Sequence, residues 1–545
     1  MLTVNWADGT IKLDINTKGW EGLTCRFEKH ELWLTVVLLS IISITSFLVY
    51  YSNGLGVAYN DARSHLNIGR RVVEGLQPGL AQLGSVWLPL LHALMIPTIW
   101  SDFMWHSGLA GALPSMVSFV FTGAIISLLL KRMGIGWWGR LTGLFIFVAN
   151  INVLYLQSTA MTELLLLATM TAGVYEIFVW YQDQSHLLPL FKSAVFIMLA
   201  SLVRYDAWFL LVFLLGLLLI DPLKKRGIKH AEGLFFLFGT LAGLGVVLWF
   251  LWNLLIFKDP FYFAFGPFSA YSQQKLLESA GSLVTKGNLY LSIKFYVYAL
   301  AYNQGAFTAL LGLWGFMALL VNKNLPKGSK IAAWALTAPF FFNVIALFWG
   351  HSVLHIQGLS GDTLFNVRYG IMMAPSIAVF VGFLVDRLKR LRPVFWGMLV
   401  LVTFFTFVNK DAVTIDDALY GASQKNVSEV SGWLRKYAQG EGYIFISAAS
   451  HDAIIFSSGL PMKRFIHEGT GKYWQAVNKN PSKLAKWVIM RTHDESDLTF
   501  KAMKDSGELA KYRLVEQYPF ADIYQLKDEY LSELISSIDQ VKSSN

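Results

Sequence analysis

An apolar stretch near the start of the chain decides the fold class. Residues 32–51 read LWLTVVLLSIISITSFLVYY and contain no Asp, Glu, Lys, Arg or His. A helix that crosses a bilayer needs about 20 such residues. The stretch lies too deep in the chain, and is too long, for a cleaved signal peptide, and no small-residue cleavage site follows it. The sequence therefore predicts a membrane-spanning helix here.

Further apolar segments follow along the chain, and together with the first they predict about eleven transmembrane helices. The pair at 188–203 and 207–220 is short, so a re-entrant arrangement is an alternative there. The other predicted spans are 109–130, 138–156, 159–181, 234–257, 300–321, 331–349, 369–385 and 393–408.

The composition supports a polytopic membrane protein with room for one modest soluble domain. Of the 545 residues, 54% are hydrophobic and only 15% are charged, with 40 Phe and 19 Trp. Soluble proteins are about 25% charged. These values exclude a water-soluble globule, a disordered chain and a fibrous repeat. The single cysteine, Cys25, excludes a disulfide framework and a Cys-rich metal site.

Lysine and arginine residues predict the orientation, because they gather on the cytoplasmic side of membrane proteins. With a cytoplasmic N-terminus and eleven spans, all the basic clusters fall on one side, so the net charge of +9 reflects topology rather than nucleic-acid binding. The prediction is a multi-pass plasma-membrane protein with a cytoplasmic segment at 1–31, a membrane domain at 32–408 and an extracytoplasmic domain at 409–545. The clusters are Arg26 and Lys29; Lys131 and Arg132; Lys224, Lys225, Arg226 and Lys229; Lys323, Lys327 and Lys330; and Arg387, Lys389, Arg390 and Arg392.

The C-terminal part alternates between helical and strand patterns, which predicts a small α/β domain. Helices are expected at 427–438, near 451–458, near 481–486 and at 497–510, and strands at 443–448, at 486–491 and as a pair within 513–526.

The first outer loop, 52–108, is long, and long loops carry function. Asn60 is predicted to cap an amphipathic helix over 61–74 that lies at the membrane surface. Asp61 and His65 then share one face, at positions i and i+4. Asp61 is a candidate general base for a hydroxyl; the alternative is an acid favoured by the helix dipole.

Further ionisable groups occur at the outer ends of predicted spans, where each needs a partner or a purpose. Glu163 follows the third span, Arg204 and Asp206 link the fifth and sixth, and Arg368 and Tyr369 begin the tenth. Arg204 pairs either with Glu163 or with Asp206. Arg368 is the best candidate for holding a phosphate, since a guanidinium binds phosphate oxygens through two hydrogen bonds.

These motifs, in this order and on one side, resemble those of the GT-C glycosyltransferases, and among them the enzymes related to protein O-mannosyltransferases and aminoarabinose transferases. The resemblance covers about residues 30–408. It implies transfer of a sugar, usually with inversion, from a polyprenyl-phosphate carrier to a hydroxyl on a lipid, glycan or protein. The motifs are Asn60–Gly75, Trp87-Leu88-Pro89, Met161-Thr162-Glu163, Arg204-Tyr205-Asp206 and Val367-Arg368-Tyr369-Gly370.

The resemblance also implies roles for single residues. Asp61 matches the family's catalytic acid, whereas the second acid of the Asp-Glu pair found in related enzymes is replaced by Ala62. Arg368 most closely matches the donor-phosphate arginine, with Arg63 as the second choice. His65, which shares a helix face with Asp61, is a further phosphate-binding candidate independent of the resemblance. No metal ligands are predicted, although a divalent cation remains an option.

The predicted C-terminal domain contains a motif of its own. His467 and Glu468 fall in a predicted loop next to Tyr473 and Trp474, and an exposed aromatic pair suits stacking on sugar rings. The hypothesis is that this domain roofs the active site and helps to select the acceptor. The alternative is an ordinary surface loop.

Three functions compete at this point. The first is a transferase whose partners are a polyprenyl-phosphate-linked sugar, a hydroxyl-bearing acceptor and membrane lipids, without nucleic acid. The second is a transporter or flippase of lipid-linked sugars, and the third is a non-catalytic partner in a cell-envelope complex. The long first loop with its acid, the outer domain and the lack of two matching halves favour the enzyme.

Overall fold

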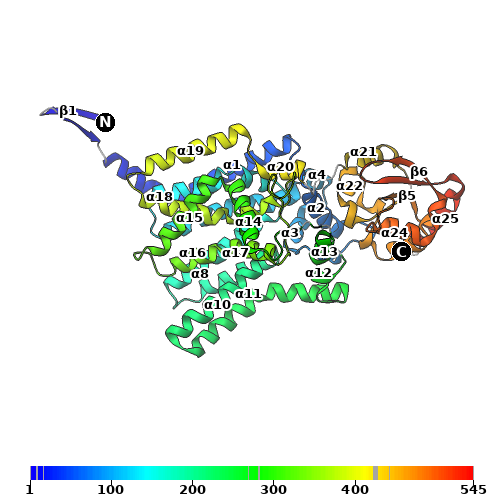
Figure 1. Ribbon diagram of the computed structural model, residues 1–545, viewed down its shortest axis with the longest axis horizontal. Helices are drawn as coiled ribbons and strands as arrows, with labels where there is room; N and C mark the ends of the chain where they lie inside the picture. The colour runs from blue at the N-terminus through cyan, green and yellow to red at the C-terminus, as the bar shows by residue number, and fades with distance from the viewer. Residues whose placement is uncertain are drawn as a thin grey trace.

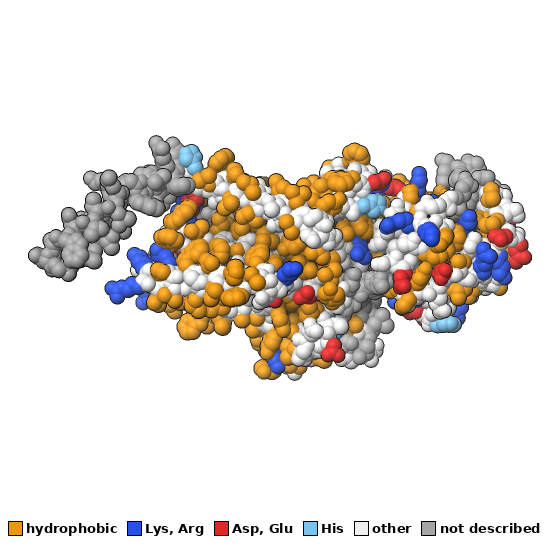
Figure 2. Space-filling model, turned by 90° about the horizontal axis from the view of Figure 1, so that it is seen from above, with side chains coloured by type: hydrophobic (Ala, Val, Ile, Leu, Met, Phe, Trp, Pro, Cys, Tyr) orange, Lys and Arg blue, Asp and Glu red, His pale blue; other side chains and the backbone are white. Residues whose placement is uncertain are grey.

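The computed structural model describes residues 2–7, 10–15, 18–267, 269–279, 281, 283–421, 427–440 and 442–543. A body of apolar helices occupies the centre, and the C-terminal domain lies at one end of the long axis (Figure 1). Hydrophobic side chains cover the body, whereas charged side chains gather at its two ends and on the C-terminal domain (Figure 2). This distribution is that of a membrane protein with a polar domain outside the bilayer.

Helices form the membrane domain because its long apolar segments can satisfy their backbone groups in lipid only internally. After the N-terminal hairpin of β1 (Leu2–Ala7) and β2 (Thr10–Ile15), its elements are α1 (Lys18–Ser52), α5 (Leu109–Arg132), α6 (Trp137–Val148), α7 (Ile151–Leu156), α8 (Glu163–Gln182), α9 (Leu188–Ser201), α10 (Asp206–Arg226), α11 (Ile228–Phe257), α14 (Leu289–Gln304), α15 (Ala306–Val321), α16 (Ser329–Leu336), α17 (Ala338–Phe348), η2 (Val367–Met373), α18 (Ala374–Arg387), α19 (Arg392–Asn409) and α20 (Val413–Tyr420).

The described helices support a polytopic domain but do not confirm eleven spans. Eight of them are long and apolar enough to cross a membrane, or nine if α14 and α15, which are bent by 110°, count as one span. The predicted span at 138–156 is broken into α6 and α7, because the Asn150 side chain accepts the backbone N–H groups of Asn152 and Val153 and starts a new helix. The predicted span at 188–203 is the 14-residue α9.

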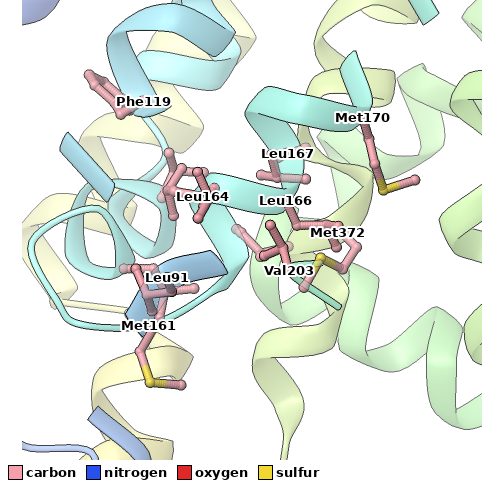
Figure 3. Close-up of a cluster of buried hydrophobic side chains, with 14 of the residues drawn as sticks. Leu91, Phe119, Met161, Leu164, Leu166, Leu167, Met170, Val203 and Met372 are labelled. Carbon is pink, nitrogen blue, oxygen red and sulfur yellow. The ribbon is translucent and has the colours of Figure 1, made fainter. Parts of the chain in front are cut away.

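Helix α8 lies at the centre of the membrane domain. It is apolar on all sides and packs against α5 and α9, as expected for a helix buried in a bundle. Leu164, Leu166 and Leu167 of α8 cluster with side chains of other elements, among them Val203 and Met372 (Figure 3). These apolar residues adjoin Glu163, Arg204 and η2, so a close-packed core fixes the positions of those polar groups.

The segments predicted to be the first and second outer loops carry short helices that lie between the membrane domain and the C-terminal domain (Figure 1). The predicted helix over 61–74 is confirmed as α2, although its N-cap is Tyr59 rather than Asn60. The elements are α2 (Asn60–Val73), η1 (Leu80–Gln82), α3 (Leu90–Ile99) and α4 (Asp102–His106) in the first loop, and α12 (Tyr262–Phe265) and α13 (Ala270–Ser279) in the second.

The C-terminal domain is α/β, as predicted. Its sheet has the order β4-β3-β5-β7-β6, in which β4, β3 and β5 are parallel and β7 and β6 are antiparallel additions. The elements are α21 (Ser428–Tyr437), β3 (Tyr443–Ile446), α22 (Ala448–Ser458), η3 (Met462–Arg464), β4 (Phe465–Ile466), η4 (Glu468–Thr470), α23 (Lys472–Lys479), η5 (Pro481–Lys483), β5 (Ala485–Met490), α24 (Leu498–Ser506), η6 (Glu508–Lys511), β6 (Tyr512–Gln517), β7 (Asp522–Leu526), η7 (Asp528–Tyr530) and α25 (Leu531–Ser543).

Two predictions in this domain need correction. The helix expected near 481–486 is only the short turn Pro481–Lys483, because the buried residues from Ala485 onward belong to the central strand β5. The helix expected at 497–510 ends at Ser506, where Gly507 adopts a left-handed conformation with φ of 69°. The helices α23 and α25 were not predicted.

Candidate active site

The predicted polar residues of the outer span ends meet in one place. Asp61 lies in the first turn of α2, Glu163 begins α8, and Asp206 begins α10, directly after Arg204 and Tyr205. Arg368 comes from η2, the turn that leads into α18. Helix N-termini favour carboxylates, which explains why three acids begin helices here.

Arg368 is the centre of the group. Its Nη2 donates to Asp61 Oδ2 at 2.6 Å and its Nε donates to Glu163 Oε1 at 3.2 Å. Its Nη1 lies 3.7 Å from Asp417 Oδ2. The Arg368 side chain is only 5% exposed, and the rings of Tyr59 and Tyr369 also lie 5.0 and 5.6 Å from its guanidinium.

Arg204 is the second cation of the group. Its Nη1 lies 3.4 Å from Glu163 Oε1 and its Nε donates to Asp206 Oδ2 at 3.2 Å, so both predicted pairings of Arg204 occur. The ring of Tyr369 lies 5.1 Å from the Arg204 guanidinium and 5.6 Å from that of Arg368. The aromatic ring thereby keeps the two cations beside each other.

Asp417 is a member of this group that sequence reasoning missed. It lies on α20, which packs against α7 and η2. The Tyr59 hydroxyl donates to Asp417 Oδ2 at 3.3 Å. Asn152 Oδ1 anchors α20 by accepting the Thr414 backbone N–H at 3.0 Å and the Thr414 hydroxyl at 2.8 Å. Asp417 follows the last predicted span, and no motif in the sequence distinguishes it from other acids nearby.

We call these residues the carboxylate–arginine cluster: Asp61, Glu163, Arg204, Asp206, Arg368 and Asp417. Their accessibility differs in a way that matters for chemistry. The Asp61 side chain is 32% exposed, whereas the other three carboxylates are buried. Arg204 is more exposed than Arg368, at 19%. A molecule from outside can therefore reach Asp61 and Arg204 first.

Comparisons with known proteins were made for the whole chain. No protein-family model matches it, and no curated protein sequence matches it. Among solved structures, it is similar to ArnT from Cupriavidus metallidurans bound to undecaprenyl phosphate, with a TM-score of 0.57 and 9% identity over 91% of this chain and 98% of ArnT. The apo state of the same ArnT gives a TM-score of 0.55 at 10% identity, with coverage of 91% and 98%.

A second similar structure is AglB, the oligosaccharyltransferase from Archaeoglobus fulgidus, in complex with an inhibitory peptide and a dolichol-phosphate. It gives a TM-score of 0.51 and 11% identity over 85% of this chain and 69% of AglB. Both neighbours are membrane glycosyltransferases of the GT-C superfamily. The chain has the GT-C fold. The predicted resemblance to this superfamily is therefore confirmed at the level of the fold, with the carboxylate–arginine cluster between its first outer loop and η2.

His65 lies on the same helix as the accessible acid of this GT-C fold, but it is neutral. Burial, together with Arg368 and Arg204, lowers the pKa of His65 to about 3. His92 Nδ1 donates to the Leu83 carbonyl at 3.1 Å, so its Nε2 accepts from His65 Nδ1 at 2.8 Å. His65 can offer a hydrogen bond acceptor, but it does not supply the positive charge for a phosphate.

Arg63 points elsewhere than Asp61. Residues two positions apart do not share a helix face. Arg63 Nε donates to the Val57 carbonyl at 2.8 Å, and its Nη1 donates to Asn60 Oδ1 at 3.2 Å. Asn60 thus holds Arg63 instead of capping α2, which corrects the predicted N-cap. The role of Arg63 toward phosphate stays a prediction.

The His467–Glu468 motif has structural partners within the C-terminal domain. Glu468 accepts hydrogen bonds from the Ser447 hydroxyl and from the backbone N–H groups of Ala448 and Ala449, at the N-terminus of α22. His467 is buried, and its Nδ1 accepts the Gly469 N–H at 3.1 Å. The motif therefore stabilises a turn and a helix end, and its proposed role toward the acceptor remains untested.

The prediction that the two aromatic residues next to this motif are exposed was wrong. Tyr473 and Trp474 lie on α23, and Tyr473 is buried in the second hydrophobic core of the domain. Trp474 is partly buried against Phe445 of β3, with ring centroids 5.4 Å apart. The sequence read as a loop because α23 is short and follows two glycines, Gly469 and Gly471.

The C-terminal domain is joined to the helix that carries Asp61. Asp452 of α22 forms an ion pair with Arg71 of α2. Asn67 of α2 donates to both the side chain and the carbonyl of Asp452, at 2.8 and 2.9 Å. A further contact runs from Gln82 to the Gly469 carbonyl at 2.7 Å. The domain thus contacts α2 and the loop that follows it directly (Figure 1).

Metal binding was left open by the sequence. Within the described residues, no three side chains of His, Cys, Asp or Glu are grouped so that they could hold a metal ion.

Proposed function

We propose that this protein is a membrane glycosyltransferase that moves a sugar from a polyprenyl-phosphate carrier to a hydroxyl acceptor on the extracytoplasmic face. The observation that carries this proposal is Asp61, the accessible carboxylate of a cluster in which the other acids are buried. An accessible acid that contacts Arg368, in a cluster that also holds Arg204, combines a base with positive charge, as displacement of a phosphate requires.

Asp61 acts as the general base. It accepts the proton of the acceptor hydroxyl while that oxygen forms a bond to the anomeric carbon of the sugar. The bond from the anomeric carbon to the phosphate oxygen breaks, and polyprenyl phosphate leaves as an anion. Because this leaving group is already stable as an anion, no general acid is required.

The two arginines divide the remaining work. Arg368 donates to Asp61 and is enclosed by carboxylates, so it orients the base. Arg204 is the more exposed guanidinium and lies next to Tyr369, so it is the better partner for the departing phosphate. This assignment moves the phosphate role from Arg368, as the sequence predicted it, to Arg204.

Two similarities support a polyprenyl-phosphate donor. The similar ArnT structure contains undecaprenyl phosphate and the similar AglB structure contains a dolichol-phosphate.

Turnover of a panel of polyprenyl-phosphate sugars tests the proposal. Purified protein in lipid vesicles is supplied with each donor, and released polyprenyl phosphate is measured. We expect release from at least one donor, and a loss of about 100-fold or more in Asp61→Asn, as is usual for removal of a general base. The control is Asp362→Asn, an exposed acid in the third outer loop.

The outcomes separate the proposal from its competitor. Normal turnover in a folded Asp61→Asn variant would exclude the general base. Movement of the lipid-linked sugar across the bilayer without release of polyprenyl phosphate would show a flippase instead of a transferase.

A further inference from the structure

A cavity lies at the end of the membrane domain away from the carboxylate–arginine cluster. It has a volume of about 230 Å³ and is bordered by the end of α8, the last turn of α10 and the loop between α15 and α16. We call it the lysine cavity, because four lysines line it. Its lining includes Tyr181, Lys225, Lys323, Lys327 and Lys330.

The lysine cavity and the proposed active site are at opposite ends of α8. Glu163 begins this helix and Tyr181 is one of its last residues. At a rise of 1.5 Å per residue, the two are separated by about 27 Å, close to the thickness of a bilayer's hydrocarbon core. A ligand of the lysine cavity is therefore distinct from a donor at the cluster.

The enrichment of basic residues on the cytoplasmic side of membrane proteins explains why lysines occur at this end of the protein. It does not explain why the loop that carries them packs so closely onto α8. Gly328 has a left-handed conformation with φ of 88°, and a Cβ at this position would lie 2.5 Å from Tyr181 Cβ. The lysine-bearing loop is thus packed tightly onto α8, which only glycine permits. A loop that served only as a charge marker would not need this close approach.

Three of the four lysines at the cavity, and the Tyr181 hydroxyl, lack partners among the described residues. Lys225 pairs with Asp221 at 2.6 Å, whereas no carboxylate among the described residues pairs with Lys323, Lys327 or Lys330. The Tyr181 hydroxyl is buried and has no hydrogen-bond partner in the described part of the chain. A buried hydroxyl without a partner is costly, so a ligand that accepts its hydrogen bond would be favoured.

A helix N-terminus adds to this positive environment. Helix α16 begins at Ser329, next to Lys330, and no side chain caps it. The free N–H groups of a first turn attract phosphate groups. Lysines, a helix N-terminus and an unpartnered hydroxyl are all complementary to an oxyanion. The lining residues of the cavity include no carboxylate, and Asp221 beside it is paired with Lys225.

We propose that the lysine cavity binds the phosphate-bearing headgroup of an anionic membrane lipid. A lipid is favoured over free phosphate because apolar residues, Leu325, Pro326 and Ile331, share the lining with the lysines. Trp334, one turn further along α16, exposes its side chain, as aromatic residues do at membrane interfaces. Basic pockets between helices at the membrane surface are suited to such headgroups. This inference does not depend on the proposed function.

Native mass spectrometry of the full-length protein tests the inference. The protein in detergent is titrated with phosphatidylglycerol or with phosphatidylcholine, and bound lipid is counted. We expect selective binding of phosphatidylglycerol, weakened about 30-fold in the double variant Lys327→Gln/Lys330→Gln. Tyr181→Phe removes only the hydroxyl, and it should weaken binding severalfold without lowering the thermal unfolding midpoint of the lipid-free protein, because an unpartnered buried hydroxyl is removed.

A matched control removes two charges at the same end of the molecule. Lys389→Gln/Arg390→Gln lies in the loop after α18 and outside the cavity, so it should retain wild-type binding. Equal weakening in this control, or equal affinity for the two lipids, would overturn the site. Binding of inorganic phosphate alone, without competition from phosphatidylglycerol, would overturn the lipid as its source.

Discussion

Asp61 and Arg368 are 307 residues apart in the chain, and a hydrogen bond of 2.6 Å joins them. The bond connects the first outer loop to η2, the turn that precedes α18. It is also the point where the accessible acid meets the buried cation of the carboxylate–arginine cluster. The proposed base is therefore held by an arginine whose side chain is almost completely buried.

Substitution of the two arginines should give different results, because their surroundings differ. Arg368→Ala leaves Glu163 and Asp417 buried without their central cation, and breaking buried pairs in this way costs about 3–5 kcal/mol. Arg204→Ala leaves one buried acid, Asp206, without its cation, whereas Glu163 keeps Arg368. It should therefore cost less stability than Arg368→Ala and should mainly raise KM for the donor, because Arg204 is partly exposed. Thermal unfolding and steady-state kinetics measure the two effects, with the exposed Arg132→Ala as control. The division of roles is wrong if Arg204→Ala is the less stable variant.

Asp417 offers a test of the cluster's charge balance. Asp417→Asn keeps an acceptor for the Tyr59 hydroxyl and removes one of four carboxylates around two arginines, so the free energy of unfolding should be maintained. Asp417→Ala removes the acceptor, and a buried hydroxyl without a partner costs about 1–3 kcal/mol. Thermal unfolding midpoints compare the two variants. Equal destabilisation by Asn and Ala would mean that Asp417 acts through its charge.

Weakening the contact between α2 and the C-terminal domain should lower the activity, because α2 carries the proposed base Asp61. Asp452→Ala leaves Arg71 without its carboxylate and removes one acceptor for Asn67, so α2 loses part of its support. We expect faster proteolysis between the two domains and a lower kcat. The fold of the C-terminal domain itself should not change. Limited proteolysis and kinetics measure this, and the double variant Arg71→Asp/Asp452→Arg should recover part of both. Wild-type kcat in Asp452→Ala would show that the domain does not position α2.

Acid should destabilise the protein through the buried His65. Burial lowers the pKa of His65 to about 3 from its ordinary 6.5, so between these values the unfolded chain binds more protons than the folded one. Stability contributed by neutral His65 is complete above pH 6.5, and it falls by up to about 1.4 kcal/mol per pH unit below that. Unfolding midpoints between pH 4.5 and 7.5 measure the slope, which His65→Gln should reduce. An unchanged slope in that variant contradicts a neutral, buried His65.

Much of the membrane domain could be predicted because its signal is local. The uncharged run at 32–51 and the segment around Glu163–Gln182 are helices for reasons that are contained in their own composition. The same reasoning predicted that Asp61, Glu163, Arg204 and Arg368 lie on one side of the membrane. The structure shows that ion pairs connect these four residues.

What could not be predicted depends on tertiary packing. Asp417 joins the cluster only because α20 folds back onto α7 and η2, and nothing in the neighbouring sequence indicates this. Tyr473 was expected on the surface, but the short helix α23 directs its side chain into a hydrophobic core of the C-terminal domain. The interruption at Asn150, which divides a predicted span, depends on a side chain that competes for backbone N–H groups.

The most direct test of the account is the lipid that the protein retains. Native mass spectrometry of protein purified from its own membranes should detect polyprenyl phosphate, or its glycosylated form, on the wild type. The signal should be weakened in Arg204→Ala and retained in the control Arg132→Ala. Detection of a glycosylated form would also name the sugar for the turnover assay. Ordinary phospholipid alone in all three samples would contradict the proposed donor.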